Sequence, residues 1–275
     1  MRVCLMIEGQ EGVTWDQWRA LAESAEASGF EALFRSDHYE SLGGAPNRGS
    51  LDAWGTTNAL AAITTTLKLG TLVSPVTFRH PSVLARSVVT ADHISGGRVE
   101  LGIGAGWHEG EHRSFGFPFE ATRDRFDRLI EQIELVHRSW DADPFDFQGR
   151  FYRLEQADPQ PKPLQRPHPN LIVGGNAGPR SAALAARWAD EYNTVHPTPE
   201  QARERKVRVD AACAKAGRDP LTFSAMIPLE GRPDELVQTL DDLAAAGVDR
   251  VMLQHLQHDD LATVELVGRE VIPAV

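Results

Sequence analysis

The chain has 275 residues, of which 41% are apolar and 24% are charged, so it is long enough to bury a core without disulfides or metal ions. Its 28 basic and 39 acidic residues give a net charge of −11, which argues against a protein that neutralises nucleic-acid phosphates or lies on an anionic membrane. Any anionic ligand must therefore be held by a local feature of the structure.

Short apolar runs rich in β-branched residues alternate along the chain with longer amphipathic segments. The first run precedes a capping-box pattern formed by Thr14 and Gln17, which predicts a helix that ends at Gly29. In chain order, the apolar runs predict strands over 3–7, 31–34, 68–73, 99–103, 170–173, 191–195, 222–227 and 250–253.

The segments between these runs predict helices, which begin at a cap and often end at glycine. The apolar positions of 123–140 follow the helical period closely. Thr198 and Gln201 repeat the capping box, with Pro199 at the first helical position and Gly217 past the end. After the first helix, we expect helices over 51–64, 81–94, 123–140, 179–189, 199–216, 233–246 and 260–271.

The alternation of strands and helices predicts an α/β fold with parallel strands, because each parallel pair needs a crossover that a helix supplies. Eight such units close into a (β/α)8 TIM barrel, and a doubly wound open sheet is the alternative. We expect a single domain over residues 1–275. The alternating stretch 145–153 predicts a hairpin inserted between the fourth and fifth strands, within about 141–168 and ahead of a proline-rich bridge.

The residues that follow the predicted strands are unusually polar, and chemistry in a parallel barrel is located at these strand ends. Four histidines lie within a few residues of such an end: His38, His108, His196 and His255. Loops are polar in any case, so each histidine alone is an ambiguous signal. Their convergence at one face of the barrel predicts a functional site there.

Two glycine-rich turns follow strands, over 102–107 and 174–180. Exposed amides at a helix N-terminus form an anion site even on an acidic protein, so the second turn predicts a phosphate cradle with Arg180 adding a positive charge. The alternative is that the glycines only permit a tight turn. Neither turn has the spacing of a Rossmann fingerprint.

The segment 108–112 matches the HExxH zinc-protease pattern letter for letter. That pattern needs a continuous helix to place both imidazoles on one face, and the preceding strand and glycines argue against such a helix. We therefore expect no metal site.

The cysteines Cys4 and Cys213 form neither a disulfide framework nor a CxxC motif, which suits a reducing cytosol. The first apolar run is too short for a secretory or membrane-spanning segment. We expect a cytoplasmic protein that binds neither nucleic acids nor membranes.

Four motifs together resemble the luciferase-like oxidoreductases, and the resemblance extends from Arg2 to about Pro273. They are SDH at 36–38, LGTLV at 69–73, ELGIGAGWHEGEH at 100–112 and VGGNAG at 173–178. The chain looks most similar to the branch that depends on the deazaflavin coenzyme F420. Members of that branch share the Gly-Ala-Gly-Trp run, which ends here at Trp107, and a segment similar to 115–118.

The resemblance implies an α/β barrel that holds a flavin or deazaflavin ring over the carboxyl ends of its strands. Similar proteins have a non-proline cis peptide at the end of the third strand, which falls here between Leu72 and Val73. The cofactor-binding residues that the resemblance implies are Leu72, Val73, Ala105, Gly106, Trp107, Gly174, Gly175, Asn176, Ala177, Gly178 and Arg180.

The resemblance also implies catalytic residues. His38 is the candidate proton donor or base, because histidine exchanges protons near neutral pH. Asp37 is expected to orient His38 or to contact the cofactor, and the alternative is that it caps the following loop. Glu109 is a further candidate, as is Glu111.

The chain departs from members that oxidise sugar phosphates, which have a tryptophan where Leu42 stands and a glutamate where Trp107 stands. These departures argue against sugar-phosphate oxidation. The aromatic residues Trp107, Phe115, Phe117 and Phe119 favour a more apolar substrate, and the alternative is that these rings only pack against one another. We predict hydride transfer between coenzyme F420 and a small organic molecule. The alternatives are a reduced-FMN monooxygenase, similar to alkanesulfonate monooxygenases and supplied by a flavin reductase, and a non-catalytic flavin-binding protein. The resemblance implies a homodimer. A flavin or F420 reductase is a candidate partner protein.

Overall fold

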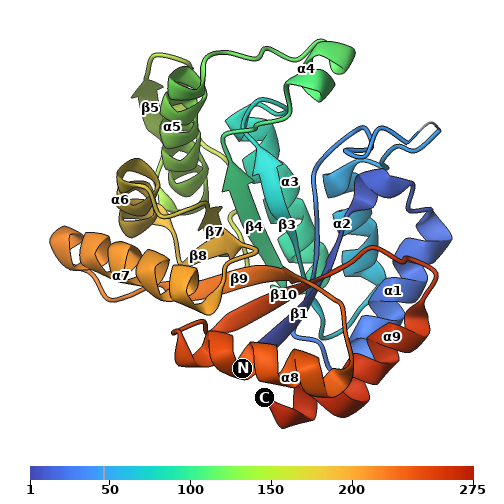
Figure 1. Ribbon diagram of the computed structural model, residues 1–275. Coiled ribbons are helices and arrows are strands. Elements are labelled where there is room, and N and C mark those ends of the chain that lie inside the picture. Colours follow the sequence, from blue (N-terminus) through green and yellow to red (C-terminus); the bar gives the residue numbers. More distant parts are fainter. Residues whose placement is uncertain (46) are drawn as a thin grey trace.

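The computed structural model describes residues 1–45 and 47–275, and its strands form a closed parallel barrel (Figure 1). The order around the barrel is β1-β10-β9-β8-β7-β4-β3-β2. This arrangement confirms the predicted TIM barrel and excludes the open sheet. The barrel strands are β1 (Arg2–Ile7), β2 (Ala32–Arg35), β3 (Lys68–Pro75), β4 (Val99–Gly104), β7 (Asn170–Gly174), β8 (Glu191–Val195), β9 (Thr222–Pro228) and β10 (Arg250–His255).

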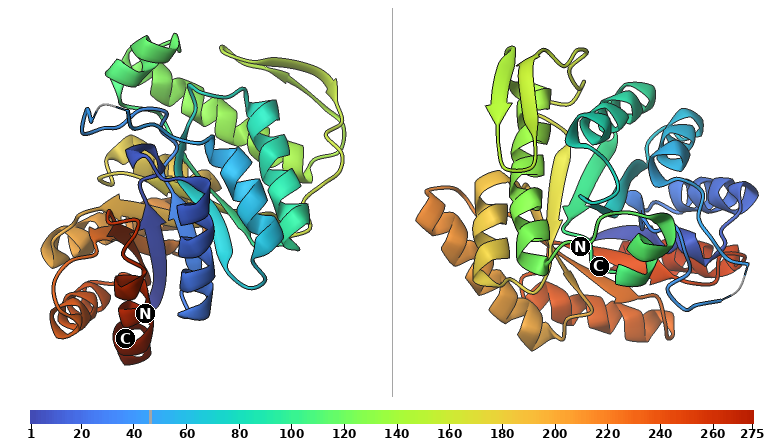
Figure 2. Two further views of the ribbon diagram at one scale, coloured as in Figure 1. Left: turned by 90° about the vertical axis from the view of Figure 1, so that its right-hand side faces the viewer. Right: turned by 90° about the horizontal axis from the view of Figure 1, so that it is seen from above.

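Helices follow the barrel strands and surround them, as the view from above shows (Figure 2). The last predicted helix, over 260–271, changes pitch after Leu266 and continues as a π-helical turn over Val267–Val271 and a 3-10 turn over Ile272–Ala274. The helices are α1 (Trp15–Ala27), α2 (Ala53–Ile63), α3 (Pro81–Ser95), α4 (Glu109–Phe115), α5 (Thr122–Asp141), α6 (Pro179–Trp188), α7 (Pro199–Ala216), α8 (Pro233–Ala245) and α9 (Leu261–Leu266). None of the helices in the described residues is long and apolar enough to cross a bilayer.

Both predicted capping boxes are present. The Thr14 hydroxyl accepts from the Gln17 amide at the start of α1, and the Thr198 hydroxyl accepts from the Gln201 amide at the start of α7. In each box the glutamine side chain accepts from the threonine backbone N–H in return. Each cap contributes about 1 kcal/mol, so the helix starts predicted from these pairs are stabilised locally.

One helix was predicted wrongly. The glycines around 108–112 were expected to prevent a helix there, but α4 begins at Glu109 and ends before Gly116, which has a φ of 73°. Gly110 lies inside α4 and costs about 1 kcal/mol relative to alanine. The hydrogen bonds of the buried Glu111 to His38 and Tyr39, and of the buried His112 to Thr77, offset that cost, because tertiary contacts routinely override local propensity.

The predicted hairpin is present between the fourth and fifth barrel strands. β5 (Phe145–Gln148) pairs with β6 (Arg153–Ala157) in antiparallel fashion, outside the barrel and alongside α5 (Figure 1). Phe145 and Tyr152 pack on Leu135 of α5 in a small apolar cluster of their own. The hairpin is therefore attached to the outer helix layer and does not interrupt the barrel.

The amino end of the barrel is closed by a buried charge cluster. Arg250, which is 1% exposed, lies within 2.9 Å of carboxylate oxygens of Glu31, Glu100 and Glu191. These residues stand at or near the first positions of their strands. The cluster fills one end of the barrel and leaves the opposite, carboxyl end for a ligand.

Candidate functional site

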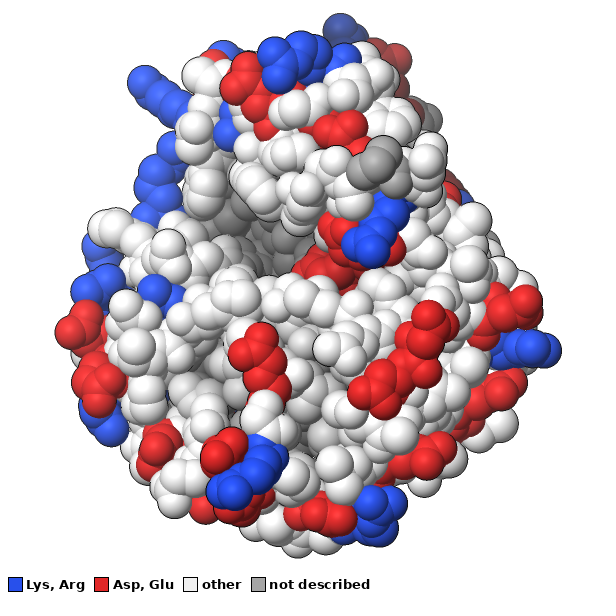
Figure 3. Space-filling view, turned by 45° about the vertical axis from the view of Figure 1, so that its right-hand side comes forward, with Lys and Arg blue, Asp and Glu red and all other residues white. Residues whose placement is uncertain are grey.

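A cavity of about 500 Å³ opens at the carboxyl ends of the barrel strands, on the hollowed face that Figure 3 shows. Its size falls in the range of small-molecule and cofactor sites. The residues of its wall come mainly from strand ends and the loops that follow them. They are Glu8, Ser36, His38, Leu42, Leu72, Val73, Pro75, Phe78, Ile103, Gly104, Ala105, Gly106, Trp107, His108, Glu111, His112, Gly174, Gly175, Asn193, Val195 and Met226.

The end of β3 bulges into this wall. The Leu72-Val73 peptide is cis, as the resemblance implied, and the pairing of β3 with β4 shifts register beyond Thr71. A Cβ at Gly104 would lie 2.7 Å from Val73 Cγ2, and one at Gly102 would lie 2.2 Å from the Thr71 carbonyl oxygen. These glycines of β4 are therefore required by the close approach of β3, a role that the sequence did not predict.

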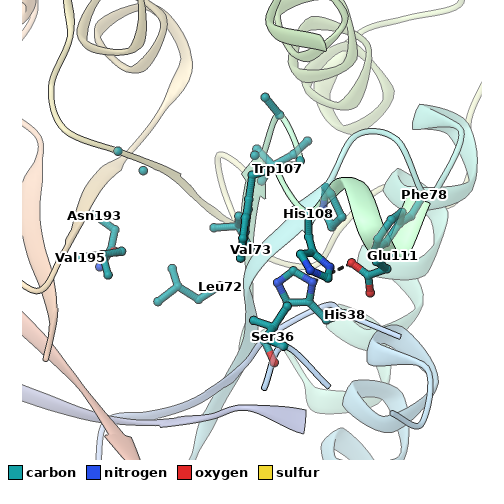
Figure 4. A pocket seen from close by; sticks show the side chains of 18 of the residues that line it. Ser36, His38, Leu72, Val73, Phe78, Trp107, His108, Glu111, Asn193 and Val195 are labelled. Atoms are coloured by element: carbon teal, nitrogen blue, oxygen red, sulfur yellow. Dashed lines mark hydrogen bonds and ion pairs between the residues drawn. The ribbon is translucent and has the colours of Figure 1, made fainter. Parts of the chain in front are cut away.

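His38 lies at the cavity wall and is held by a buried carboxylate (Figure 4). Its Nδ1 is 2.8 Å from Glu111 Oε2, and the other oxygen of Glu111 accepts from the Tyr39 amide. Burial raises the pKa of Glu111, but the hydrogen bonds from His38 and Tyr39 outweigh burial and leave the pKa below its usual value. An ionised Glu111 fixes a proton on Nδ1 of His38, so Nε2 is the nitrogen that can exchange a proton with a ligand.

Of the three acidic residues predicted for the site, Glu111 contacts His38, whereas Asp37 and Glu109 lie outside the cavity lining. Glu109 is exposed on α4 and does not line the cavity. Asp37 is 2% exposed, accepts from Ser74 Oγ at 2.8 Å and pairs with Arg79. Among the hydrogen bonds of the described residues, Asp37 has none to His38; it ties the end of β2 to the end of β3, a role that the sequence did not predict.

Two of the four histidines near strand ends line the cavity. The ring of His108 lies 6.4 Å from that of His38. His196 is exposed, and the buried His255 contacts the Asp260 carbonyl. His112 also lines the wall, with Nδ1 2.7 Å from the His108 carbonyl oxygen and Nε2 2.6 Å from Thr77 Oγ1. In the part of the chain that the structure describes, no group of three or more His, Cys, Asp or Glu side chains is arranged to hold a metal ion.

The second glycine-rich turn leads from the cavity wall to the start of α6. Gly174 and Gly175 line the cavity, and Gly178 is the N-cap residue of α6. The Ala177 amide donates to Tyr192 Oη at 2.8 Å. Arg180 lies 2.5 Å from Asp127 Oδ1, so its charge is shared with that carboxylate. Asn176 lies between these glycines, in a turn whose helix end favours an anion.

The residues present fit a planar tricyclic ring. Leu72, Val73 and Ala105 give the cavity apolar surface, and Gly106, with a φ of 77°, lets the chain turn beside it. A Cβ at Gly175 would lie 3.2 Å from Tyr192 Oη, so the glycine keeps the turn open. Trp107 is 63% exposed at the same wall, where a ligand can cover it.

Replacing Glu111 by glutamine is expected to lower the free energy of unfolding at neutral pH by about 1–3 kcal/mol, the size of a buried hydrogen bond to a charged group. Because the pKa of Glu111 is lowered in the fold, its stabilisation is present at neutral pH and is lost as the pH falls through the lowered pKa. The free energies of unfolding of the unmodified protein and of Glu111→Gln, measured with urea, should therefore differ at neutral pH and become equal in acid. A difference that does not change with pH would contradict an ionised Glu111.

The chain is similar to proteins of one known family. A family model described as luciferase-like monooxygenase matches residues 2–259. The chain is 34% identical over 210 residues to an FMNH2-dependent dimethylsulfone monooxygenase of Pseudomonas putida, an alignment that covers 75% of this chain and 56% of that protein. It is 32% identical over 239 residues to an F420-dependent hydroxymycolic acid dehydrogenase of Mycobacterium tuberculosis, covering 84% of this chain and 61% of that protein. The chain thus spans less than two thirds of the length of these two relatives.

A solved structure has the same fold. An F420-dependent secondary alcohol dehydrogenase in complex with an F420-acetone adduct superimposes with a TM-score of 0.89, covering 100% of this chain and 98% of that chain. The sequence identity is 19%, so this likeness bears on the fold alone.

Proposed function

Because the chain belongs to the luciferase-like monooxygenase family, and is therefore an oxidoreductase, we propose that it transfers a hydride between coenzyme F420 and a small organic substrate. The observation that carries the proposal is the pair of His38 and buried Glu111 at the cavity wall. When bound, the deazaflavin supplies a ring carbon that accepts or donates a hydride. The protein binds and orients the substrate and the cofactor, and it moves the proton that accompanies the hydride.

The proposed mechanism assigns the proton to His38. For an alcohol substrate, the hydroxyl proton passes to His38 Nε2 while the carbinol C–H bond breaks and its electron pair leaves with the hydrogen as hydride. Glu111, 2.8 Å from Nδ1, stabilises the imidazolium that forms. In the reverse direction His38 returns the proton to the carbonyl oxygen. Asp37 and Arg79 keep the ends of β2 and β3 together and so position His38 beside the bulge.

The proposed cofactor contacts follow the two glycine-rich turns. Apolar residues of the bulge and the first turn would hold the ring, and the turn before α6 would hold the phosphate. The ring residues are Leu72, Val73, Ala105, Gly106 and Trp107, and the phosphate residues are Gly174, Gly175, Asn176, Ala177, Gly178 and Arg180. That the protein is a cytoplasmic homodimer served by an F420 or flavin reductase stays a prediction.

A reduced-FMN monooxygenase is the second candidate. It is favoured by the 34% identity to a relative whose name specifies FMNH2. The same cavity would serve, but the reaction would consume oxygen and need a supply of reduced flavin. Hydride transfer by F420 needs neither oxygen nor reduced flavin, so these two requirements distinguish the candidates.

The experiment that tests the cofactor is a titration of the purified protein with F420 and, separately, with FMN. Quenching of cofactor fluorescence and shifts in absorbance report binding. We expect F420 to bind at least about tenfold more tightly than FMN. A control variant, Ala105→Trp, fills the proposed ring site and should lose binding of the preferred cofactor. Tight binding of FMN alone would support the monooxygenase, and binding of neither would contradict both candidates.

A further inference from the structure

The cavity wall is acidic as well as apolar. Among the described residues that line it, two are carboxylates, Glu8 and Glu111, and none is a lysine or arginine. Glu111 is paired with His38 at 2.8 Å. Glu8 forms no ion pair with any Lys, Arg or His in the described residues, so it is the carboxylate of the wall whose charge no side chain balances.

Glu8 follows β1 and is held in place by two neutral amides. Its Oε2 accepts from Gln10 Nε2 at 2.8 Å, and its Oε1 accepts from Gln254 Nε2 at 2.6 Å. Gln10 is held in turn by the hydroxyl of Ser36, which donates to its Oε1. These contacts fix the position of the carboxylate without cancelling its charge. Each oxygen keeps a lone pair for one more donor.

Glu8 also lies close to the segment that carries His38. β1 and β2 are neighbours in the barrel, with Ile7 opposite Arg35, so Glu8 and Ser36 follow adjacent strand ends. Adjacent strands are about 4.8 Å apart, a separation that a molecule of a few bonds spans. A substrate whose reacting carbon lies beside His38 can therefore present a second group to Glu8.

We propose that Glu8 binds an ammonium group of the substrate, so that the cavity selects small, largely apolar amines and rejects organic acids. This inference rests on the proposed function, since it names the substrate class of the same cavity. A fixed carboxylate at an apolar wall attracts a cation more strongly than one in open water does. An acidic substrate would meet the same charge and find no lysine or arginine on the described wall to oppose it.

The test measures binding with three ligands built on one benzylic carbinol. Phenylethanolamine carries an ammonium group, ethyl phenyl carbinol carries a neutral methyl group in its place, and mandelate carries a carboxylate. Calorimetric titrations are run at neutral pH on the protein alone and on the protein saturated with F420. We expect the amine to bind about tenfold more tightly than the neutral alcohol, and mandelate to bind most weakly.

Variants assign the preference to one side chain. Glu8→Gln should bind the amine and the neutral alcohol equally, because it keeps the shape and loses the charge. Glu8→Asp should retain most of the preference. Glu230→Gln is the matched control, since Glu230 is exposed after β9 at the same end of the barrel and lies outside the cavity lining. It should leave the preference unchanged.

The outcomes separate this inference from the function on which it rests. Equal affinities for the amine and the neutral alcohol in the unmodified chain, or a preference that survives in Glu8→Gln, would overturn the role of Glu8. A protein that binds the amine selectively but never binds F420 would support the role of Glu8 and contradict the proposed cofactor.

Discussion

Replacing His38 by alanine is expected to lower kcat about 10²- to 10⁴-fold, the usual contribution of a positioned acid or base, and to leave F420 affinity nearly unchanged. The substitution removes Nε2, which takes the substrate proton in the proposed mechanism, and leaves the buried Glu111 without its partner. Steady-state kinetics give kcat and KM, and the fluorescence titration gives cofactor affinity independently.

Two further variants make this result specific. Glu111→Gln keeps the imidazole and its Nε2, so its loss in kcat should be smaller than that of His38→Ala. His196→Asn serves as the control, because His196 is exposed, lies outside the cavity lining and has a φ of 42°, a conformation that asparagine tolerates. It should keep full activity. Unchanged turnover in His38→Ala with intact cofactor binding would remove this histidine from the mechanism.

The fold could be predicted because its information is local. Most barrel strands are short apolar runs, and the capping boxes at Thr14 and Thr198 mark helix starts that the structure confirms. The helix α4 could not be predicted in this way. It is stabilised by hydrogen bonds of Glu111 and His112 to distant parts of the chain, and those contacts have no signature within the segment itself.

The position of the candidate site could be predicted from the sequence, but the contact between His38 and Glu111 could not. His38 and Trp107 follow strands, and the structure brings both to one cavity wall. Glu111 lies 73 residues from His38 in sequence, so their contact depends on how two loops meet. Nothing local distinguishes Glu111 from Glu109, since only the direction in which each faces on α4 separates the buried carboxylate from the exposed one.

Cavity residues inside the strands were missed for a different reason. Asn193 of β8 and Met226 of β9 line the cavity, but a strand of a TIM barrel is covered on both faces. The strand sequences, Glu-Tyr-Asn-Thr-Val in β8 and Thr-Phe-Ser-Ala-Met-Ile-Pro in β9, therefore do not show by an alternating pattern which positions face the ligand. The polar Asn193 in the middle of a barrel strand is the signal that could have indicated a position facing the cavity.

The charge cluster at the amino end of the barrel makes the strongest prediction for stability. Replacing Arg250 by methionine is expected to lower the free energy of unfolding by about 3–5 kcal/mol at neutral pH, because it leaves Glu31, Glu100 and Glu191 without their shared cation. Burial already raises the pKa of Glu191 with Arg250 present, so Glu191 takes up a proton readily when the arginine is lost.

The pH dependence of that destabilisation identifies its cause. A carboxyl whose pKa is raised in the fold destabilises the fold while it is ionised, and protonation removes the penalty, so the deficit of Arg250→Met should shrink as the pH falls. The control is Arg232→Met, because Arg232 is 72% exposed in its pair with Asp234, and an exposed pair contributes about 0–1 kcal/mol. Urea unfolding midpoints at neutral and acidic pH measure the stability of Arg250→Met and of Arg232→Met. A deficit in Arg250→Met that is as large in acid as at neutral pH would point to lost packing of the arginine side chain and against unbalanced buried charge.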